Sequence, residues 1–288
     1  MASVRTTLIV NPYASKVTPE LAERVARALG AAETSFTERA GHATELAREA
    51  DAEAVVVFSG DGGFNEVLNG ARPETLLGFV PGGGTSVLPR VLGLPRDPVA
   101  AATQLTAGRT RRIGLGRANG RRFGFAAGVG LDAELIRRMD ARGRREDGKR
   151  PGDAVFAWTA VQTLAETRVR FDPTLDVQGH GRAAFALVAN ADPYTYVGRL
   201  PLRLPRGARL EGGLDLLGPR AFRLRSLPGA VRYILTGRTR LPLLELHDQD
   251  RIEVRCDLPL PLQLDGEDVG DVIEVVFEAE RDAVSVLI

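Results

Sequence analysis

Two glycine-rich stretches are the first residues of this 288-residue chain whose types and spacing could support chemistry. Residues 59–63 read Ser-Gly-Asp-Gly-Gly after a predicted apolar strand, and residues 82–84 are three glycines after a second one. A glycine loop between a parallel strand and a helix presents backbone N–H groups and the positive end of the helix. Such loops bind anions, most often phosphate. Two of them together predict a polyphosphate site.

Asp61 lies inside the first glycine stretch, where its negative charge would repel phosphate. The carboxylate is explained if Mg²⁺ lies between it and the phosphates, directly or through water. The alternative is that Asp61 is a turn residue and that the glycines only make tight strand-to-helix turns. The Walker A motif and the dinucleotide-binding G-x-G-x-x-G fingerprint are both absent.

A pair of carboxylates stands near the end of the chain, in the sequence Leu-Asp-Gly-Glu at residues 264–267. Asp265 and Glu267 are two residues apart, so on a strand they would share one face. Two neighbouring carboxylates could orient and deprotonate a hydroxyl group, and their proximity can separate their pKa values. The alternative is a β-turn, because Asp-Gly is a common turn pair.

The elements that must position these residues alternate between strand and helix over the first hundred residues. The pattern predicts strands at 6–11, 52–58 and 75–81, a weaker strand at 32–37, and helices at 18–30, 41–50, 64–70 and 97–108. Apolar strands that alternate with helices predict a parallel sheet covered on both faces. Ligands of such sheets bind beyond the carboxyl ends of the strands, where both glycine stretches lie.

The pattern changes after about residue 112. A hairpin is expected to turn at Asn119-Gly120, and most later segments read as strands with turn signals between them. Two helical pieces are expected within 132–167, and another helix over 226–237. The predicted fold class is therefore α/β plus all-β, with a β-rich second domain.

Composition limits the classes of partner and compartment. Hydrophobic residues make up 44% and charged residues 26% of the chain, as in soluble globular proteins. The net charge of +1 gives no reason to expect nucleic acid as a partner. The single cysteine, Cys256, excludes an internal disulfide and favours a cytoplasmic protein. No run reaches the roughly 18 apolar residues that would span a bilayer, so membrane contact is expected to be peripheral.

Four motifs together resemble the diacylglycerol kinase catalytic family, which includes bacterial lipid kinases and sphingosine kinases and is related to NAD kinases. Residues 59–70 resemble its G-G-D-G-T-x-N-E-V-x-N-G signature. Residues 11–15, 81–95 and 262–268 resemble its N-P-x-S-G, P-x-G-T-x-N-x-x-A-R and L-D-G-E motifs, in the family's order. The resemblance spans almost the whole chain.

The resemblance implies a fold and an activity. The fold would be an NAD-kinase-like three-layer α/β nucleotide domain, residues 1–112 plus about 276–288, and a C-terminal β-sandwich for the lipid, residues 113–275. The protein would transfer the γ-phosphoryl group of ATP to a hydroxyl of a membrane lipid with the help of Mg²⁺. Diacylglycerol is the default acceptor; a sphingoid base, another glycerolipid or a polyprenol is left open, and so is a homodimer.

The resemblance also implies roles for single residues. Glu267 would accept the proton of the lipid hydroxyl, Asp265 would help to hold the metal or the hydroxyl, and Asp61 would hold Mg²⁺. The residues expected at the nucleotide are Asn11, Thr37, Ser59, Gly60, Asp61, Gly62, Gly63, Asn65, Gly83, Gly84 and Thr85.

The chain departs from the family pattern at several of these positions. Gly63 stands where a threonine is expected, Gly84 where a threonine or serine is expected, and Ser86 where an asparagine is expected. The loss of one phosphate-bonded hydroxyl would cost about ten- to a hundredfold in binding. Thr85, one position along, could replace the hydroxyl missing at Gly84. Gly212 also stands at the acidic position of the family's structural metal site.

Three functional hypotheses follow. The first is the lipid kinase. The second is a catalytically weakened or inactive nucleotide- or lipid-binding regulator of the same fold, which the missing threonines favour and the intact carboxylates disfavour. The third is a kinase for a soluble substrate such as NAD, which the late L-D-G-E motif disfavours. A basic run over residues 137–150 could attract anionic lipid headgroups, with a solvated loop as the alternative.

Overall fold

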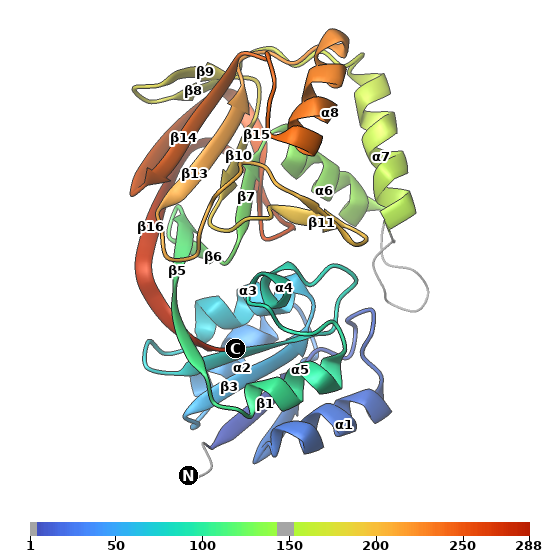
Figure 1. Ribbon diagram of the computed structural model, residues 1–288, viewed down its shortest axis with the longest axis vertical. Coiled ribbons are helices and arrows are strands. Elements are labelled where there is room, and N and C mark those ends of the chain that lie inside the picture. The colour runs from blue at the N-terminus through green and yellow to red at the C-terminus, as the bar shows by residue number, and fades with distance from the viewer. Residues whose placement is uncertain (1–4, 143–152) are drawn as a thin grey trace. The chain divides into compact units, whose positions relative to one another are not determined.

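The computed structural model describes residues 5–142 and 153–288. The chain forms two compact units, Met1–Leu115 with Arg281–Ile288, and Gly116–Glu280 (Figure 1). The sequence predicted the division 1–112 plus 276–288 and 113–275. Within the described residues, no helix is long and apolar enough to cross a membrane.

The first unit contains a parallel sheet with the strand order β2-β1-β3-β4-β16. Its strands are β1 (Thr6–Val10), β2 (Glu33–Phe36), β3 (Ala54–Ser59), β4 (Leu76–Pro81) and the end of β16 (Glu267–Leu287). Every residue of β3 is buried, as expected for a strand covered on both faces. The sheet therefore matches the apolar pattern of the sequence.

Helices cover both faces of this sheet. Helix α1 (Pro19–Leu29) packs against α5 (Pro98–Leu105), and α2 (His42–Glu49) packs against α3 (Asp61–Gly70). The step from β1 to β2 runs toward one edge of the sheet, and the steps from β2 to β3 and from β3 to β4 run toward the other edge. Right-handed crossovers therefore place α1 on one face and α2 and α3 on the other. Helix α4 (Val87–Val91) follows the second glycine stretch. The predicted α/β class is confirmed for this unit.

The second unit is rich in antiparallel strands, in the order β14-β13-β10-β7-β15-β16. Its strands are β5 (Thr110–Ala118), β6 (Arg121–Phe123), β7 (Ala126–Val129), β8 (Leu175–Val177), β9 (Gly181–Ala183), β10 (Ala186–Ala189), β13 (Leu214–Pro219), β14 (Leu243–Gln249), β15 (Arg251–Leu264) and the start of β16, with β11 (Thr195–Val197) and β12 (Leu200–Leu202) as a separate hairpin. Strands β5 and β16 each begin in one unit and end in the other. The β5–β6 turn falls at Asn119 and Gly120, as predicted.

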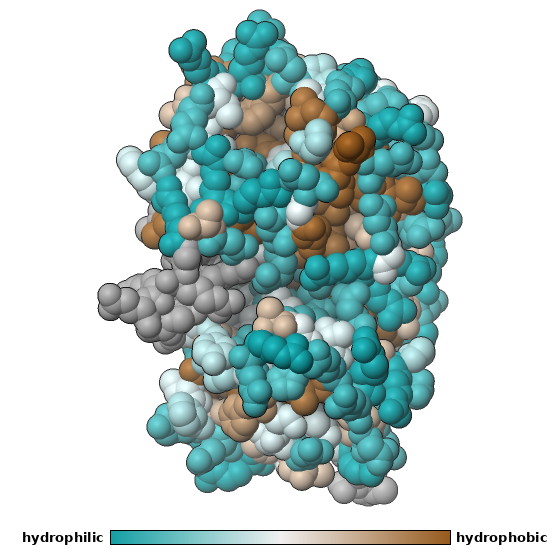
Figure 2. All heavy atoms as spheres, turned by 180° about the vertical axis from the view of Figure 1, so that it is seen from behind, coloured by the Kyte–Doolittle hydropathy of each residue, from teal (hydrophilic) through white to brown (hydrophobic). Residues whose placement is uncertain are grey.

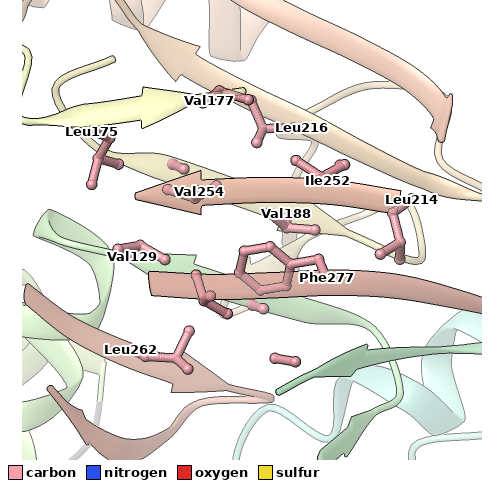
Figure 3. Close-up of a cluster of buried hydrophobic side chains, with 14 of the residues drawn as sticks. Val129, Leu175, Val177, Val188, Leu214, Leu216, Ile252, Val254, Leu262 and Phe277 are labelled. Atoms are coloured by element: carbon pink, nitrogen blue, oxygen red, sulfur yellow. The ribbon is translucent and has the colours of Figure 1, made fainter. Parts of the chain in front are cut away.

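A long β15 builds the core of the second unit. Its residues 254–256 pair with β8, whereas residues 262–264 pair with β7, and the register shifts between the two parts. Side chains of β7, β10 and β13 therefore meet those of β8, β15 and β16 in one cluster, seen in Figure 3 around Val188 and Phe277. Cys256 belongs to this core, and burial raises the pKa of its thiol to about 11. The predicted β-rich domain is confirmed.

Helices flank the second unit where the sequence predicted them. They are α6 (Leu131–Ala141), α7 (Asp153–Glu166) and α8 (Leu227–Thr236), the last preceded by a 3-10 turn, η1 (Leu224–Ser226). Figure 2 shows a mostly hydrophilic face, with hydrophobic side chains gathered mainly on the part formed by this unit.

Candidate active site

The first glycine stretch is the start of a helix rather than a loop. Helix α3 begins at Asp61, earlier than expected, and Gly60 is its N-cap with φ −90° and ψ −177°. The prediction that residues 59–63 form a loop is therefore wrong, because Gly62 and Gly63 lie in the first helical turn. The first N–H groups of a helix have no partners within it, so this turn offers amides at the carboxyl end of β3.

The glycines let the two stretches approach each other. A Cβ on Gly83 would lie 2.9 Å from the Cα of Gly60, and a Cβ on Gly82 would lie 2.9 Å from the carbonyl oxygen of Ser59. The amide of Gly82 donates to that oxygen at 2.6 Å. The glycines therefore allow the backbones of the two stretches to pack directly against each other. The two stretches form one continuous surface.

Asp61 connects the first stretch to the helix that follows the second. Its Oδ1 accepts a hydrogen bond of 2.7 Å from the amide of Val87, the first residue of α4. The carboxylate also lies in the first turn of α3, so two helix starts favour its negative charge. Among residues 5–142 and 153–288, no three acidic, histidine or cysteine side chains cluster as a metal site.

Ser59 and Gly63 compete for one space. A Cβ on Gly63 would overlap the hydroxyl of Ser59 and lie 2.7 Å from its Cβ. The threonine of the family pattern does not fit at position 63 while Ser59 keeps this place. The Ser59 Oγ is fully buried and has no hydrogen-bond partner, which is rare for a buried hydroxyl. Ser59 stands where the family signature has a glycine, so the residues at positions 59 and 63 restrict each other sterically.

The departures from the family pattern at Gly84 and Ser86 have different consequences. A Cβ on Gly84 would meet only the Oγ of Ser15, at 4.0 Å, so a side chain fits there. Ser86 has a left-handed backbone with φ 47°, which asparagine tolerates better than most residues. Ser86 stabilises this turn itself, because its Oγ accepts from the amide of Gly83 at 3.1 Å. Thr85 is half-buried beside it.

The other expected nucleotide residues follow neighbouring strands. Asn11 follows β1, and its Oδ1 accepts from the amide of Tyr13 at 2.9 Å. Thr37 follows β2 and is buried, with its amide bonded to the carbonyl of Val10 at 2.9 Å. Parallel strands end at one edge of the sheet, so both residues share the edge of the glycine stretches. Asn65 lies inside α3 and is only 1% exposed.

The rest of the signature holds α2 against α3. The carboxylate of Glu66 accepts from the amides of Gly41 and Ala43, at 2.9 and 3.0 Å, and so caps α2, whose N-cap glycine has no side chain. A Cβ on Gly70 would lie 2.8 Å from the carbonyl carbon of Thr44. Glu66 and Gly70 are thus explained by packing.

Sequence reasoning missed a group of cations beside the second stretch. The amide of Lys16 donates to the carbonyl of Gly82 at 2.9 Å. Burial lowers the pKa of the Lys16 ammonium, and the positive charges of Arg96 and Arg90 lower it further. Three cations that repel one another create a favourable place for an anion. The signal was available, since Lys16 is one of few lysines and follows the first motif.

The Leu-Asp-Gly-Glu motif forms the turn between β15 and β16. Leu264 pairs with Glu267, and the two residues between them have φ values of 50° and 80°. These are the features of a two-residue hairpin turn of type I′. The expectation that Asp265 and Glu267 share one strand face is therefore wrong, because the chain turns between them.

Asp265 anchors the segment that precedes β7. Its carboxylate accepts from the amides of Gly124, Phe125 and Ala126, at 2.6, 2.9 and 3.1 Å, and the residue is 3% exposed. These contacts make Asp265 a positioning residue for this turn. Glu267 is half-buried at the start of β16. The proton-accepting role of Glu267 and the metal or hydroxyl contact of Asp265 stay predictions.

A buried polar network, also missed from the sequence, supports this turn. Asp132, in the first turn of α6, accepts from the Tyr194 hydroxyl at 2.6 Å and from the Gln263 amide at 2.7 Å. Gln263 in turn accepts from the amide of Gly266 at 2.8 Å. Burial raises the pKa of the Asp132 carboxyl, against the opposing effect of its two hydrogen bonds. The network connects α6 to the residue before Glu267.

The basic run is largely neutralised where it is described. Arg137 binds Asp268 through two hydrogen bonds of 2.9 and 3.1 Å, which hold the pKa of that carboxyl below its usual range. Arg138 pairs with Glu134 at 2.6 Å. The charges of Arg137 and Arg138 are therefore paired with carboxylates of the protein itself. Arg144, Arg145, Lys149 and Arg150 lie outside the described residues.

The residues around the family's structural metal position are bonded to one another. Both oxygens of Asp215 are engaged, one by the His247 ring at 2.9 Å and one by the amide of Asp248 at 2.9 Å. The Asp248 side chain accepts from the amide of Gly213 at 2.6 Å. Gly212 has no carboxylate, and hydrogen bonds within the protein stabilise the segments around it.

Comparison with known proteins agrees with the motifs. Residues 5–118 match the family model described as "Diacylglycerol kinase catalytic domain". The matched residues make up most of the first unit. The resemblance predicted from the motifs is thereby confirmed for this part of the chain.

Individual relatives show how far the similarity extends. A diacylglycerol kinase of Bacillus subtilis is 38% identical over 109 residues, 35% of this chain and 36% of its own length. One of Staphylococcus carnosus is 32% identical over 138 residues, 43% of this chain and 44% of its own length. The chain thus matches less than half the length of these curated relatives.

Solved structures extend the likeness of fold to the whole chain. A structure from Bacillus anthracis covers all of this chain and 96% of its own, with a TM-score of 0.75 and 21% identity. Another from that organism, described as a diacylglycerol kinase, gives a TM-score of 0.68 at 19% identity and covers 97% of its own length. At this identity the likeness establishes the fold, including the strand-rich unit that follows the matched residues.

Proposed function

We propose that the protein is a lipid kinase that transfers the γ-phosphoryl group of ATP to a hydroxyl of diacylglycerol or a related membrane lipid, with Mg²⁺. The observation that carries the proposal is the joined pair of glycine stretches, with the start of α3 between them and Asp61 across both. The family match and the relatives named diacylglycerol kinase support it.

The first unit would bind the nucleotide. Amides at the start of α3 bind phosphate oxygens, while Lys16, Arg90 and Arg96 offset their negative charge. Asp61 would hold Mg²⁺, which when bound neutralises charge on the transferred group. Asn11 and Thr37 follow strand ends and Thr85 follows the second glycine stretch; these three residues would contact the rest of the nucleotide.

The second unit would supply the base. Glu267 would accept the proton of the lipid hydroxyl. The oxygen of that hydroxyl would bond to the γ-phosphorus while the bond from this phosphorus to ADP breaks. Asp265 and the network around Gln263 hold the turn on which Glu267 is mounted. Because phosphoryl transfer depends mostly on positioning, the rigidity of this turn contributes to the rate.

One observation favours a second candidate, the catalytically weakened or inactive nucleotide- or lipid-binding regulator. No hydroxyl is present at Gly84, although a side chain would fit there. The two candidates differ in turnover and share nucleotide binding.

Labelled ATP distinguishes them. The purified chain is incubated with radiolabelled ATP, Mg²⁺ and mixed micelles of total bacterial lipid extract, and the organic phase is separated. We expect a labelled lipid with wild type and with the control Glu274→Gln, a surface carboxylate of the same unit. Glu267→Gln should lose the product by orders of magnitude while ATP binding persists. ATP binding without any labelled lipid in wild type would favour the regulator.

A further inference from the structure

Helix α8 and the turn before it expose a continuous apolar stripe. Leu224, Pro228, Val231 and Leu235 are spaced by four, three and four residues, which places them along one side. Leu224 is 65% exposed, Val231 53% and Leu235 68%. Scattered apolar residues are normal on a surface, but an ordered stripe of them indicates an interaction site.

The opposite side of α8 is the one that packs against the unit. Tyr233 is buried there, and a Cβ on Gly229 would lie 2.8 Å from the Leu241 side chain. The Arg206 guanidinium donates to the carbonyl of Ile234 at 2.6 Å, near the end of the helix. The exposed stripe is therefore not needed to hold α8 in place.

A basic groove adjoins the stripe. It has a volume of about 700 Å³ and is lined by Val169, Leu224, Pro228 and four arginines, Arg168, Arg170, Arg223 and Arg225. Asp172 pairs with Arg170 and Arg223. In the part of the chain that the structure describes, the side chains of Arg168 and Arg225 make no hydrogen bond or ion pair. Positive charge therefore remains available next to the apolar side chains.

We propose that this surface, the α8 face, binds a membrane surface that contains anionic phospholipids. The stripe would enter the boundary between headgroups and acyl chains, and the groove arginines would bind headgroup phosphates. Charge favours this occupant over a second copy of the chain, since a symmetric contact brings the same patch of both copies together and would place arginines against arginines. The proposal goes beyond the kinase reaction and needs neither ATP nor turnover.

Vesicle co-sedimentation of the full chain without nucleotide tests the α8 face. Wild type should bind vesicles of phosphatidylcholine with phosphatidylglycerol, bind pure phosphatidylcholine far less, and lose affinity in high salt. Arg168→Gln with Arg225→Gln should weaken binding to anionic vesicles about thirtyfold, and Val231→Ser with Leu235→Ser about tenfold.

A matched control separates the face from general surface apolarity. Leu258→Ser with Ile273→Ser changes two exposed apolar residues on β15 and β16, and should leave binding unchanged. All substituted side chains are exposed, so melting temperatures should stay close to wild type.

Three results would overturn the proposal: no binding of wild type to anionic vesicles, equal binding by the α8 variants, or a wild-type dimer in sedimentation that the α8 variants convert to monomer. The last would assign the face to a second copy. Vesicle binding by a wild-type protein that phosphorylates no lipid would contradict the proposed kinase activity and leave the proposal for the α8 face intact.

Discussion

The hydroxyl of Ser59 occupies the space in which a side chain at Gly63 would begin. A Cβ on Gly63 would overlap the Oγ of Ser59 and lie 2.7 Å from its Cβ. Ser59 therefore occupies the space that the family's threonine would need at position 63. The pair keeps a hydroxyl at the junction of β3 and α3.

Gly63→Thr should destabilise the protein, because overpacking of a buried site costs about 1–3 kcal/mol. The double variant Ser59→Gly with Gly63→Thr restores the family pattern and removes the overlap, so it should recover most of that loss. Urea unfolding of the three proteins measures the difference. A single variant as stable as wild type would show that the two residues are independent.

Ser59→Ala removes a buried hydroxyl that has no partner. Because an unsatisfied buried polar group costs about 1–3 kcal/mol, the variant should be as stable as wild type or more stable. If this hydroxyl turns toward a bound phosphate, nucleotide affinity should fall about tenfold in the same variant. Thermal unfolding and ATP titration give the two values, and a loss of stability with unchanged affinity would make Ser59 a purely structural residue.

Gly84→Thr should fold with nearly unchanged stability, since only Ser15 lies within 4.0 Å of the new Cβ. Under the kinase proposal the added hydroxyl should raise the rate of lipid phosphorylation. Gly83→Ala is the contrasting change, because its Cβ would lie 2.9 Å from the backbone of Gly60, and it should lower the melting temperature by several degrees. Equal melting temperatures would contradict the packing of the two stretches.

The buried Asp132 predicts a pH dependence of stability. Its pKa is raised by burial above the ordinary value of 3.8, so the folded protein keeps the proton to a higher pH than the unfolded chain. Stability should therefore decrease as pH rises from about that value through the folded pKa, and the loss persists at neutral pH. Asp132→Asn, which can still accept from Tyr194 and Gln263, should remove this decrease.

Denaturant unfolding at acidic and neutral pH checks this expectation. The Asn variant should gain stability over wild type as pH rises, and Tyr194→Phe should not reproduce that gain, because it leaves the carboxyl buried with one partner fewer. Identical pH profiles for wild type and the Asn variant would mean that Asp132 does not control this titration.

Local patterns in the sequence determined much of the fold. The apolar strands, the helices between them and the turn at Asn119 and Gly120 depend on neighbours in the chain. These were found close to where they were expected, apart from the earlier start of α3. The position of the glycine stretches at strand ends follows from the same alternation. The family signature then supplied the predicted residues of the nucleotide site, which stay predictions.

Only the tertiary structure decided how these residues are used. Glycines disfavour helix, yet α3 begins at Asp61, where the bond to Val87 joins segments 26 residues apart. Asp265 meets amides about 140 residues away in sequence, and Asp132 meets Gln263 across a similar separation. Contacts between distant segments leave no periodic trace in a single sequence, which is why these roles required the structure.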